Sequence, residues 1–318
     1  MQESSPFEYL GDGITAIDIG LGRQRFGACY LIESNGAAAL FDAGTNYSVP
    51  RILAAIAERS LAPDAVRYLI ASHVHLDHAG GIGALLRELP NASVLAHPRG
   101  VPHLVDPSML QASAEGVYGV DVVAQTYGEL VPVPAQRIRA LADDECIDLD
   151  GRTLRFMDSP GHARHHLTLY DETSASWFTG DCFGISYRDF DGGSAPFIFP
   201  TTSPIQFDPD AMKATIARML ERTPRAMLLT HYSRVEHPVE RSRALIRMID
   251  AQVELARGFH GRADAVAALT EALQRLYFAE VRRLGAPVAE AESRRLLAVD
   301  AELNAKGMLI WLDREGKA

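Results

Sequence analysis

A short segment after an apolar run is the feature that most restricts what this chain can fold into. Residues 66–71 are mostly apolar, as in a buried strand, and the next few positions hold three imidazoles and a carboxylate: His73, His75, Asp77 and His78. In an extended chain, side chains two positions apart point to the same side. His73 and His75 can therefore hold one ion, while Asp77 and His78, on the following turn, can reach a second ion.

The donor atoms in this segment indicate a reactive metal site. Imidazole nitrogens and carboxylate oxygens suit Zn²⁺, Fe or Mn²⁺. No cysteine lies in the segment, which argues against a closed structural zinc site. We therefore expect a centre that keeps one coordination position open for water.

Further ligand-type residues follow other strand-like runs in the same way. They are His162, Asp181 and His231, and the runs before them are 153–157, 175–178 and 226–230. A metal site at one edge of a sheet requires this repeated arrangement of a strand followed by a ligand. The sequence thus predicts that the separate motifs contribute to one site.

The order of these motifs resembles the metallo-β-lactamase-fold hydrolase superfamily, in its glyoxalase-II-like and thioesterase-like branch. The motifs extend from about Gly27 to about Tyr232. The resemblance implies two divalent metal ions per chain, with zinc favoured and iron or manganese as alternatives. It assigns the first ion to His73, His75 and His162, the second to Asp77, His78 and His231, and the bridging position to Asp181.

An earlier motif, Asp42-Ala43-Gly44, matches an Asp-x-Gly that the superfamily carries after a strand. A second explanation stays open beside this match. Asp42 can hydrogen-bond the loop from Ser72 to His78 and orient a metal ligand from behind.

The pattern of elements predicts an α/β fold, since strand-like and helix-like segments alternate through most of the chain. The resemblance makes this a four-layer αββα metallo-β-lactamase sandwich with a C-terminal helical segment. We expect a catalytic domain at residues 1–237 and helices at 238–318, which either cap the site or form a homodimer surface. The expected helices are 239–259, 263–284 and 288–304, with a short apolar strand at 308–312.

Several residues outside the ligand motifs are candidates for binding substrate. Residues 98–136 form a long connection, which we expect to shape the pocket wall as a lid. Arg and Tyr side chains can hold the polar head of an acyl substrate. The predicted substrate-binding residues are His166, Tyr187, Arg188 and Arg234.

One departure from the glyoxalase-II-like pattern bears on the substrate. Where those proteins carry a second Gly-His after the first, this chain has Arg164-His165-His166. The departure argues against a glutathione thioester as the substrate.

Composition narrows the class of partner. The 318 residues are 47% hydrophobic and carry a net charge of −10 at pH 7, which argues against nucleic acid or a membrane surface as a partner. No stretch reaches the roughly 20 apolar residues that span a bilayer, and the first residues show no secretory signal. The three cysteines are scattered, as in proteins with reduced thiols. We expect a cytoplasmic enzyme with a small-molecule substrate.

These observations lead to two functional hypotheses. The first is a dinuclear metal-dependent hydrolase, in which a metal-bridging hydroxide cleaves an ester-type bond and Asp77 or Asp181 shuttles the proton. A thioester or lactone is favoured, and a phosphodiester is the further candidate. The alternative is a non-hydrolytic di-iron protein that binds dioxygen or a small molecule as a sensor or oxidoreductase module, because ligand type alone does not separate zinc from iron.

Overall fold

The computed structural model describes residues 5–202 and 205–316, which form two compact units. Among the described residues, the first unit comprises 5–158, 165–180 and 224–234, and the second comprises 159–164, 181–202, 205–223 and 235–316. The division into domains 1–237 and 238–318, whose outer ends lie outside the described residues, stays a prediction. In the structure the C-terminal helices begin near the same position, but two earlier segments, 159–164 and 181–223, belong to the same unit as these helices.

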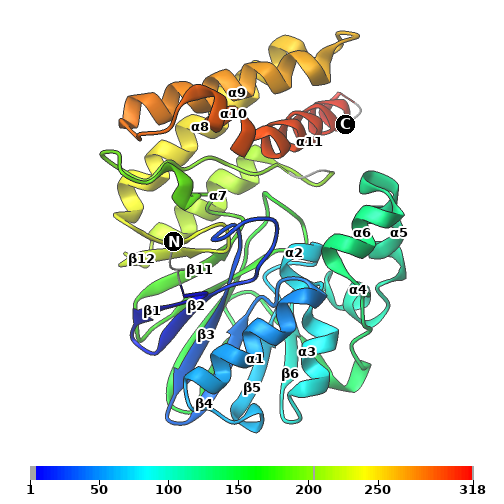
Figure 1. The fold of residues 1–318 in the computed structure, drawn as a ribbon, viewed down its shortest axis with the longest axis vertical. Coiled ribbons are helices and arrows are strands. Elements are labelled where there is room, and N and C mark those ends of the chain that lie inside the picture. Colours follow the sequence, from blue (N-terminus) through cyan, green and yellow to red (C-terminus); the bar gives the residue numbers. More distant parts are fainter. Residues whose placement is uncertain (1–4, 203–204, 317–318) are drawn as a thin grey trace. The chain divides into compact units, whose positions relative to one another are not determined.

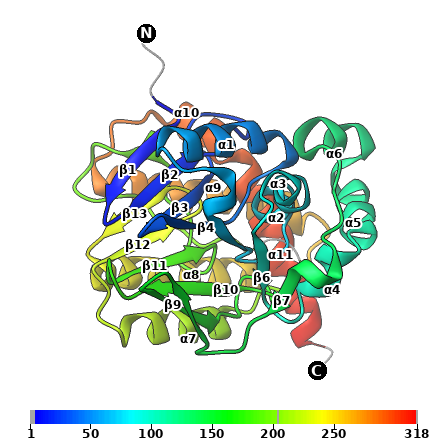
Figure 2. The same cartoon turned by 90° about the horizontal axis from the view of Figure 1, so that it is seen from below.

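The first sheet contains seven strands in sequence order and begins as an antiparallel meander. From β4 onward its neighbours are parallel, so the carboxyl ends of β4, β5 and β6 lie at one edge (Figure 2). The strands are β1 (Phe7–Gly11), β2 (Ile14–Asp18), β3 (Ala28–Ser34), β4 (Ala37–Phe41), β5 (Val66–Ile70), β6 (Ser93–Ala96) and β7 (Ile138–Ala140).

The second sheet has the order β13-β12-β11-β10-β9-β8. Its neighbours from β8 to β11 are antiparallel, whereas β11 and β12 are parallel. The strands are β8 (Cys146–Leu149), β9 (Arg152–Asp158), β10 (Leu167–Asp171), β11 (Ser176–Gly180), β12 (Ala226–Leu229) and β13 (Ser233–Glu236).

The alternation of side chains along the first sheet divides the core of the first unit in two. On β3, Cys29 and Leu31 belong to the cluster under the helices, whereas Tyr30 and Ile32 belong to the cluster between the two sheets. Both faces of this strand are apolar because both are covered. Figure 2 shows α1 and α3 on one face of the first sheet and β9 to β12 on the other.

The helices of the first unit follow its strands along the chain. They are α1 (Val49–Glu58), α2 (Leu76–Ala79), α3 (Ile82–Glu88), α4 (Val101–Val105), α5 (Ser108–Tyr118) and α6 (Val120–Tyr127). Pro50 lies in the first turn of α1, where its missing N–H costs nothing. The long connection at 98–136 thus contains three α-helices, α4, α5 and α6.

The second unit is mainly helical (Figure 1). Its helices are α7 (Pro209–Leu220), α8 (Pro238–Phe259), α9 (Ala265–Leu284), α10 (Glu290–Leu296) and α11 (Ala298–Glu315). Asp208 caps α7 by accepting hydrogen bonds from the N–H groups of Asp210 and Ala211. Asn304 on α11 joins two elements, since its side chain binds the Thr202 N–H and the Tyr277 hydroxyl.

Two expectations for this region were wrong. The third expected helix, 288–304, is instead α10 followed by α11, and residues 308–312 continue α11 as a helix. Ala301, Ala305, Met308 and Leu312 are all buried, and their spacing of three or four residues places them on one helix face. A short apolar run is therefore part of a helical stripe here.

No helix in the described part of the chain is long and apolar enough to cross a membrane.

The packing of α3 gives a test of the fold. A Cβ atom at Gly83 would lie 1.8 Å from the Val131 carbonyl oxygen, so Gly83→Ala must displace the backbone. We expect a loss of about 1–3 kcal/mol in stability, measured as a lower thermal unfolding midpoint. Gly116→Ala on α5 is the control, because nothing lies within 4 Å of its Cβ position, and that midpoint should be unchanged or higher. Equal midpoints for the two variants would contradict the packing.

Candidate metal centre

The ligand loop, residues 72–79, leaves the carboxyl end of β5 in the first unit. Ser72 and His73 are buried, and His75 precedes the short helix α2, which carries Asp77 and His78. His73 Nε2 lies 2.8 Å from His75 Nδ1, so the two side chains converge on one point, as expected from their alternation in the sequence. The expected turn that carries Asp77 and His78 is the first turn of α2.

A buried carboxylate, Asp42, holds this loop from behind. Its Oδ1 accepts the Ser72 N–H at 2.8 Å. Its Oδ2 accepts the Ser72 hydroxyl at 3.0 Å, His78 Nδ1–H at 2.9 Å and the Thr230 hydroxyl at 2.9 Å. Asp42 follows β4 with a φ of +63°, a left-handed conformation that Asp tolerates better than most residues. The orienting role considered from the sequence therefore fits these contacts.

A second group of donors forms around Asp77. Ligand atoms of Asp77, His78 and His231 lie within 4.8 Å of one another. Asp77 Oδ2 is 3.3 Å from His231 Nε2 and 3.7 Å from His78 Nε2. His231 follows β12, and its Nδ1–H donates to the Phe26 carbonyl oxygen at 2.7 Å. Residues from distant parts of the chain thus meet, as the motif order implies.

Two more histidines of the first unit extend the cluster. His166 is buried and stacks on His73 with ring centroids 4.9 Å apart, and the His165 and His73 rings are 6.1 Å apart. Gly180 at the end of β11 lies against His166, since a Cβ there would be 2.5 Å from His166 Nε2. His166, one of the predicted substrate-binding residues, therefore lies beside the ligand loop.

The second unit contains the other two predicted ligands, His162 and Asp181. His162 Nε2 lies 3.5 Å from Asp181 Oδ2, and both residues are buried. His162 Nδ1–H donates to the Thr201 carbonyl oxygen at 3.2 Å. The neighbouring Cys182 donates to the Ser159 carbonyl oxygen at 2.9 Å, so its thiol has a structural contact within this unit.

The donor set fits divalent metal ions. In His78, His231 and His162, Nδ1 is held by a protein oxygen, which leaves the Nε2 lone pair for a metal. His73 Nδ1 similarly lies 3.0 Å from the Ser72 hydroxyl. Metal-binding histidines generally have such a partner behind the ring, which fixes both the tautomer and the orientation. Neutral imidazoles and carboxylates without thiolate are also the donors of a catalytic site.

The remaining predicted substrate-binding residues have other partners. The Tyr187 hydroxyl donates to Asp300 at 2.9 Å, and Arg188 pairs with Asp191 at 3.6 Å, all within the second unit. Arg234 in the first unit donates to the Leu10 carbonyl oxygen at 3.4 Å. Their roles with substrate stay predictions.

Two tyrosines that the sequence analysis did not single out also belong near the ligand loop. Tyr118 ends α5 and Tyr127 ends α6, and both are half-buried. Burial, and next the charge of the Asp77 carboxylate, raise the pKa of both phenols, so both stay protonated at neutral pH. No local sequence signal marks them, because neither belongs to a ligand motif.

The cysteines are free thiols, and Cys29 and Cys182 are buried. Burial, and then the charge of Asp42, raise the pKa of the Cys29 thiol. A protonated, buried thiol on β3 is a packing residue and not a nucleophile.

Comparison with known proteins places these motifs in a family. The family model described as Metallo-beta-lactamase superfamily matches residues 22–231. The metallo-beta-lactamase fold-containing protein ST1585 of Sulfurisphaera tokodaii is 27% identical over 206 residues, which cover 64% of this chain and 71% of that protein. The human acyl-coenzyme A thioesterase MBLAC2 is 28% identical over 191 residues, which cover 54% of this chain and 64% of that protein.

Solved structures agree with the sequence matches. The crystal structure of the metallo-beta-lactamase family protein TTHA1429 from Thermus thermophilus has a TM-score of 0.68 at 18% identity. It covers 97% of this chain and 95% of that one. The structure of ST1585 has a TM-score of 0.65 at 20% identity, with 94% and 98% covered. These likenesses confirm the predicted α/β sandwich fold.

Replacing Asp42 tests how the ligand loop is held. Asp42→Asn keeps the shape, but its NH₂ group cannot accept the hydrogen bonds that Oδ2 accepts from Ser72, His78 and Thr230. We expect zinc affinity to fall about 10- to 100-fold, measured by competition with a chromophoric chelator. The control is Asp171→Asn, which breaks the buried pair with Arg152 at 2.5–2.9 Å and should lower stability but not zinc affinity. Wild-type affinity in Asp42→Asn would show that the contacts do not orient the ligands.

Proposed function

The chain belongs to the metallo-beta-lactamase superfamily, and we propose that it is a dinuclear metal-dependent hydrolase that cleaves an ester-type bond in a small molecule. Family membership, thioesterase relatives and the His/Asp cluster support metal-dependent hydrolysis. Within this class a thioester or lactone is the favoured substrate, ahead of a phosphodiester. The name of the human relative, an acyl-coenzyme A thioesterase, supports the thioester.

The observation that carries this proposal is the arrangement of Asp77, His78 and His231. Their donor atoms are mutually close, and Nδ1 of each histidine is bound to a protein oxygen on the far side of its ring. A cluster held in this way is prearranged for a cation, because the chain has already fixed the tautomers. Histidines that only pack in the core would not need their donor atoms to converge on one point.

The full ligand set is part of the proposal. We assign His73, His75 and His162 to one ion, Asp77, His78 and His231 to the other, and Asp181 to the position between them. Support comes from the order of the motifs and from the matching chemistry in the two units. In each unit a carboxylate oxygen lies 3.3–3.7 Å from imidazole Nε2 atoms.

Bound divalent ions would supply a water whose pKa is lowered from that of bulk water to about 7, together with positive charge for the substrate's oxygen. The chain contributes orientation and proton transfer. Asp77 is half-buried, so its carboxylate can take up a proton and release it to solvent or to the leaving group. Asp181 is the other proposed proton carrier, and its burial suits transfer within a closed site.

Metal removal and replacement of one ligand test the proposal together. We expect the purified protein to contain about two zinc or manganese ions per chain and to hydrolyse a thioester or lactone. His73→Ala should lower both the metal content and kcat/KM. We expect kcat/KM to fall at least about 100-fold, because loss of a metal ligand costs more activity than loss of a residue that hydrogen-bonds a ligand from behind. A chelator should abolish turnover, and added zinc should restore it.

The control is His260→Ala, because His260 is exposed and pairs with Asp313; its metal content and kcat/KM should equal wild type. Full activity of metal-free His73→Ala protein would contradict the proposal. Two iron ions per chain, visible absorption and no hydrolysis would also contradict it and would favour the di-iron sensor or oxidoreductase hypothesis.

A further inference from the structure

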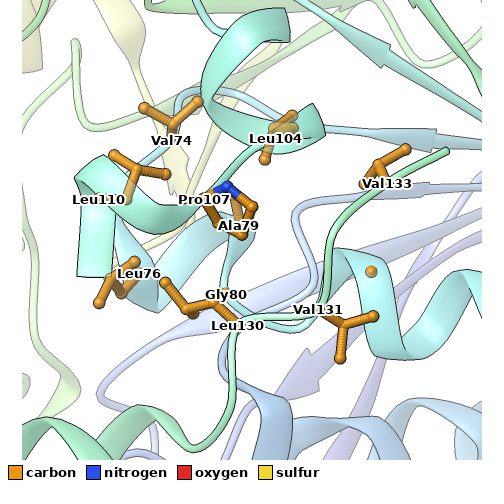
Figure 3. A pocket seen from close by; sticks show the side chains of 11 residues that line it. Val74, Leu76, Ala79, Gly80, Leu104, Pro107, Leu110, Leu130, Val131 and Val133 are labelled. Atoms are coloured by element: carbon orange, nitrogen blue, oxygen red, sulfur yellow. The ribbon is translucent and has the colours of Figure 1, made fainter. Parts of the chain in front are cut away.

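The helices α5 and α6 form a helical hairpin. The start of this hairpin lies close to the ligand loop. Val74 and Leu76 of the loop face Leu104 on α4 and Leu110 on α5 across a cavity of only about 10 Å³ (Figure 3). Room of this size holds at most about one water. Val74 and Leu104 belong to one buried apolar cluster, and Leu110 packs against it. The hairpin is therefore attached directly to the segment that carries His73, His75 and Asp77.

The other end of the hairpin is also fixed. The Tyr47 hydroxyl, on the short helix η1 (Asn46–Ser48), donates to the Ala124 carbonyl oxygen at 2.9 Å. Gly128, just after α6, fits closely against Asn46, since a Cβ there would be 2.9 Å from the Asn46 Cβ. Between these attachments α5 has no buried residue and α6 has only Val123. Most of the hairpin surface is thus left for solvent or a ligand.

The two helices end in a pair of phenols. The rings of Tyr118 and Tyr127 have centroids 6.4 Å apart. The hairpin that carries both phenols lies beside the ligand loop, because Leu110 on α5 packs against the buried cluster that includes Val74 of that loop. Neither hydroxyl has a hydrogen-bond partner among the residues that the structure describes. Half-buried protonated phenols without a protein partner are available as donors to a bound molecule.

Exposed valines lie around the turn between the helices. Val117, Val120 and Val122 are 55%, 62% and 50% exposed, and Gly119 makes the turn with a φ of +89°. The hairpin thus combines two hydrogen-bond donors with an apolar surface a few residues away. An acyl group has the matching chemistry, with one acceptor oxygen and an apolar chain.

We propose that the α5–α6 hairpin binds the acyl part of the substrate, with Tyr118 and Tyr127 donating hydrogen bonds to the acyl carbonyl oxygen and the three valines contacting the chain. This inference rests on the proposed hydrolase function and narrows its substrate to thioesters with an apolar acyl chain. The two tyrosines are substrate-binding residues, and they add to those expected from the sequence.

The test uses two ketone analogues that keep the carbonyl but cannot be hydrolysed: 2-oxododecyl-coenzyme A and 2-oxopropyl-coenzyme A. Binding to the zinc-loaded protein is measured by calorimetry. Tyr118→Phe and Tyr127→Phe should each weaken both analogues about five- to tenfold, as loss of one hydrogen bond does. Val120→Ser should weaken the long analogue about three- to tenfold and leave the short one unchanged, because only the long chain reaches the valines.

Tyr9→Phe is the matched control, since Tyr9 is an exposed tyrosine on β1, and its affinities should equal wild type. Zinc content and circular dichroism should be unchanged in all four variants, and KM for a decanoyl thioester should rise in the hairpin variants while kcat changes little. Unchanged affinities in both Phe variants of the hairpin, in a wild type that hydrolyses thioesters, would overturn the hairpin assignment alone. A wild type that holds zinc but neither hydrolyses thioesters nor binds the analogues would instead overturn the proposed function.

Discussion

The hydrogen bonds that the buried Asp42 carboxylate accepts are the interactions on which the rest of the site depends. A carboxylate without partners would be costly in the interior, and this one accepts hydrogen bonds from the Ser72 backbone and from Ser72, His78 and Thr230 side chains. These donors come after β5 and β12, so the loops at both strand ends must converge on the end of β4. The carboxylate thereby fixes where the ligand loop lies and which nitrogen His78 presents.

The sheet architecture determines where along each strand the predicted ligands emerge. The strands β4, β5 and β6 are parallel, so the residues that follow them emerge at one edge. In the second sheet β11 and β12 are parallel as well, and Asp181 and His231 follow these two strands along the chain. Each ligand is thus attached to a strand whose position is set by backbone pairing, and short loops then suffice to orient the side chains.

Some of this could be predicted from the sequence and some could not. The ligand motifs are local and dense, and the strands before them are apolar runs, so both were identified. The Phe26 carbonyl behind His231 was not predictable, because that contact joins positions far apart in the chain. Tyr118 and Tyr127 carry no motif, and their place near Asp77 depends on how α5 and α6 pack. The error at residues 308–312 arose because a short apolar run fits a strand and a buried helix face equally well.

Binding of one pair of metal ions by the separate motifs is the central claim. Anomalous diffraction from crystals of the protein purified with its native metal tests this most directly. We predict two anomalous peaks, one at His73, His75 and His162, the other at Asp77, His78 and His231, with Asp181 contacting both. A single peak, or two peaks of which neither contacts Asp181, would contradict the dinuclear centre.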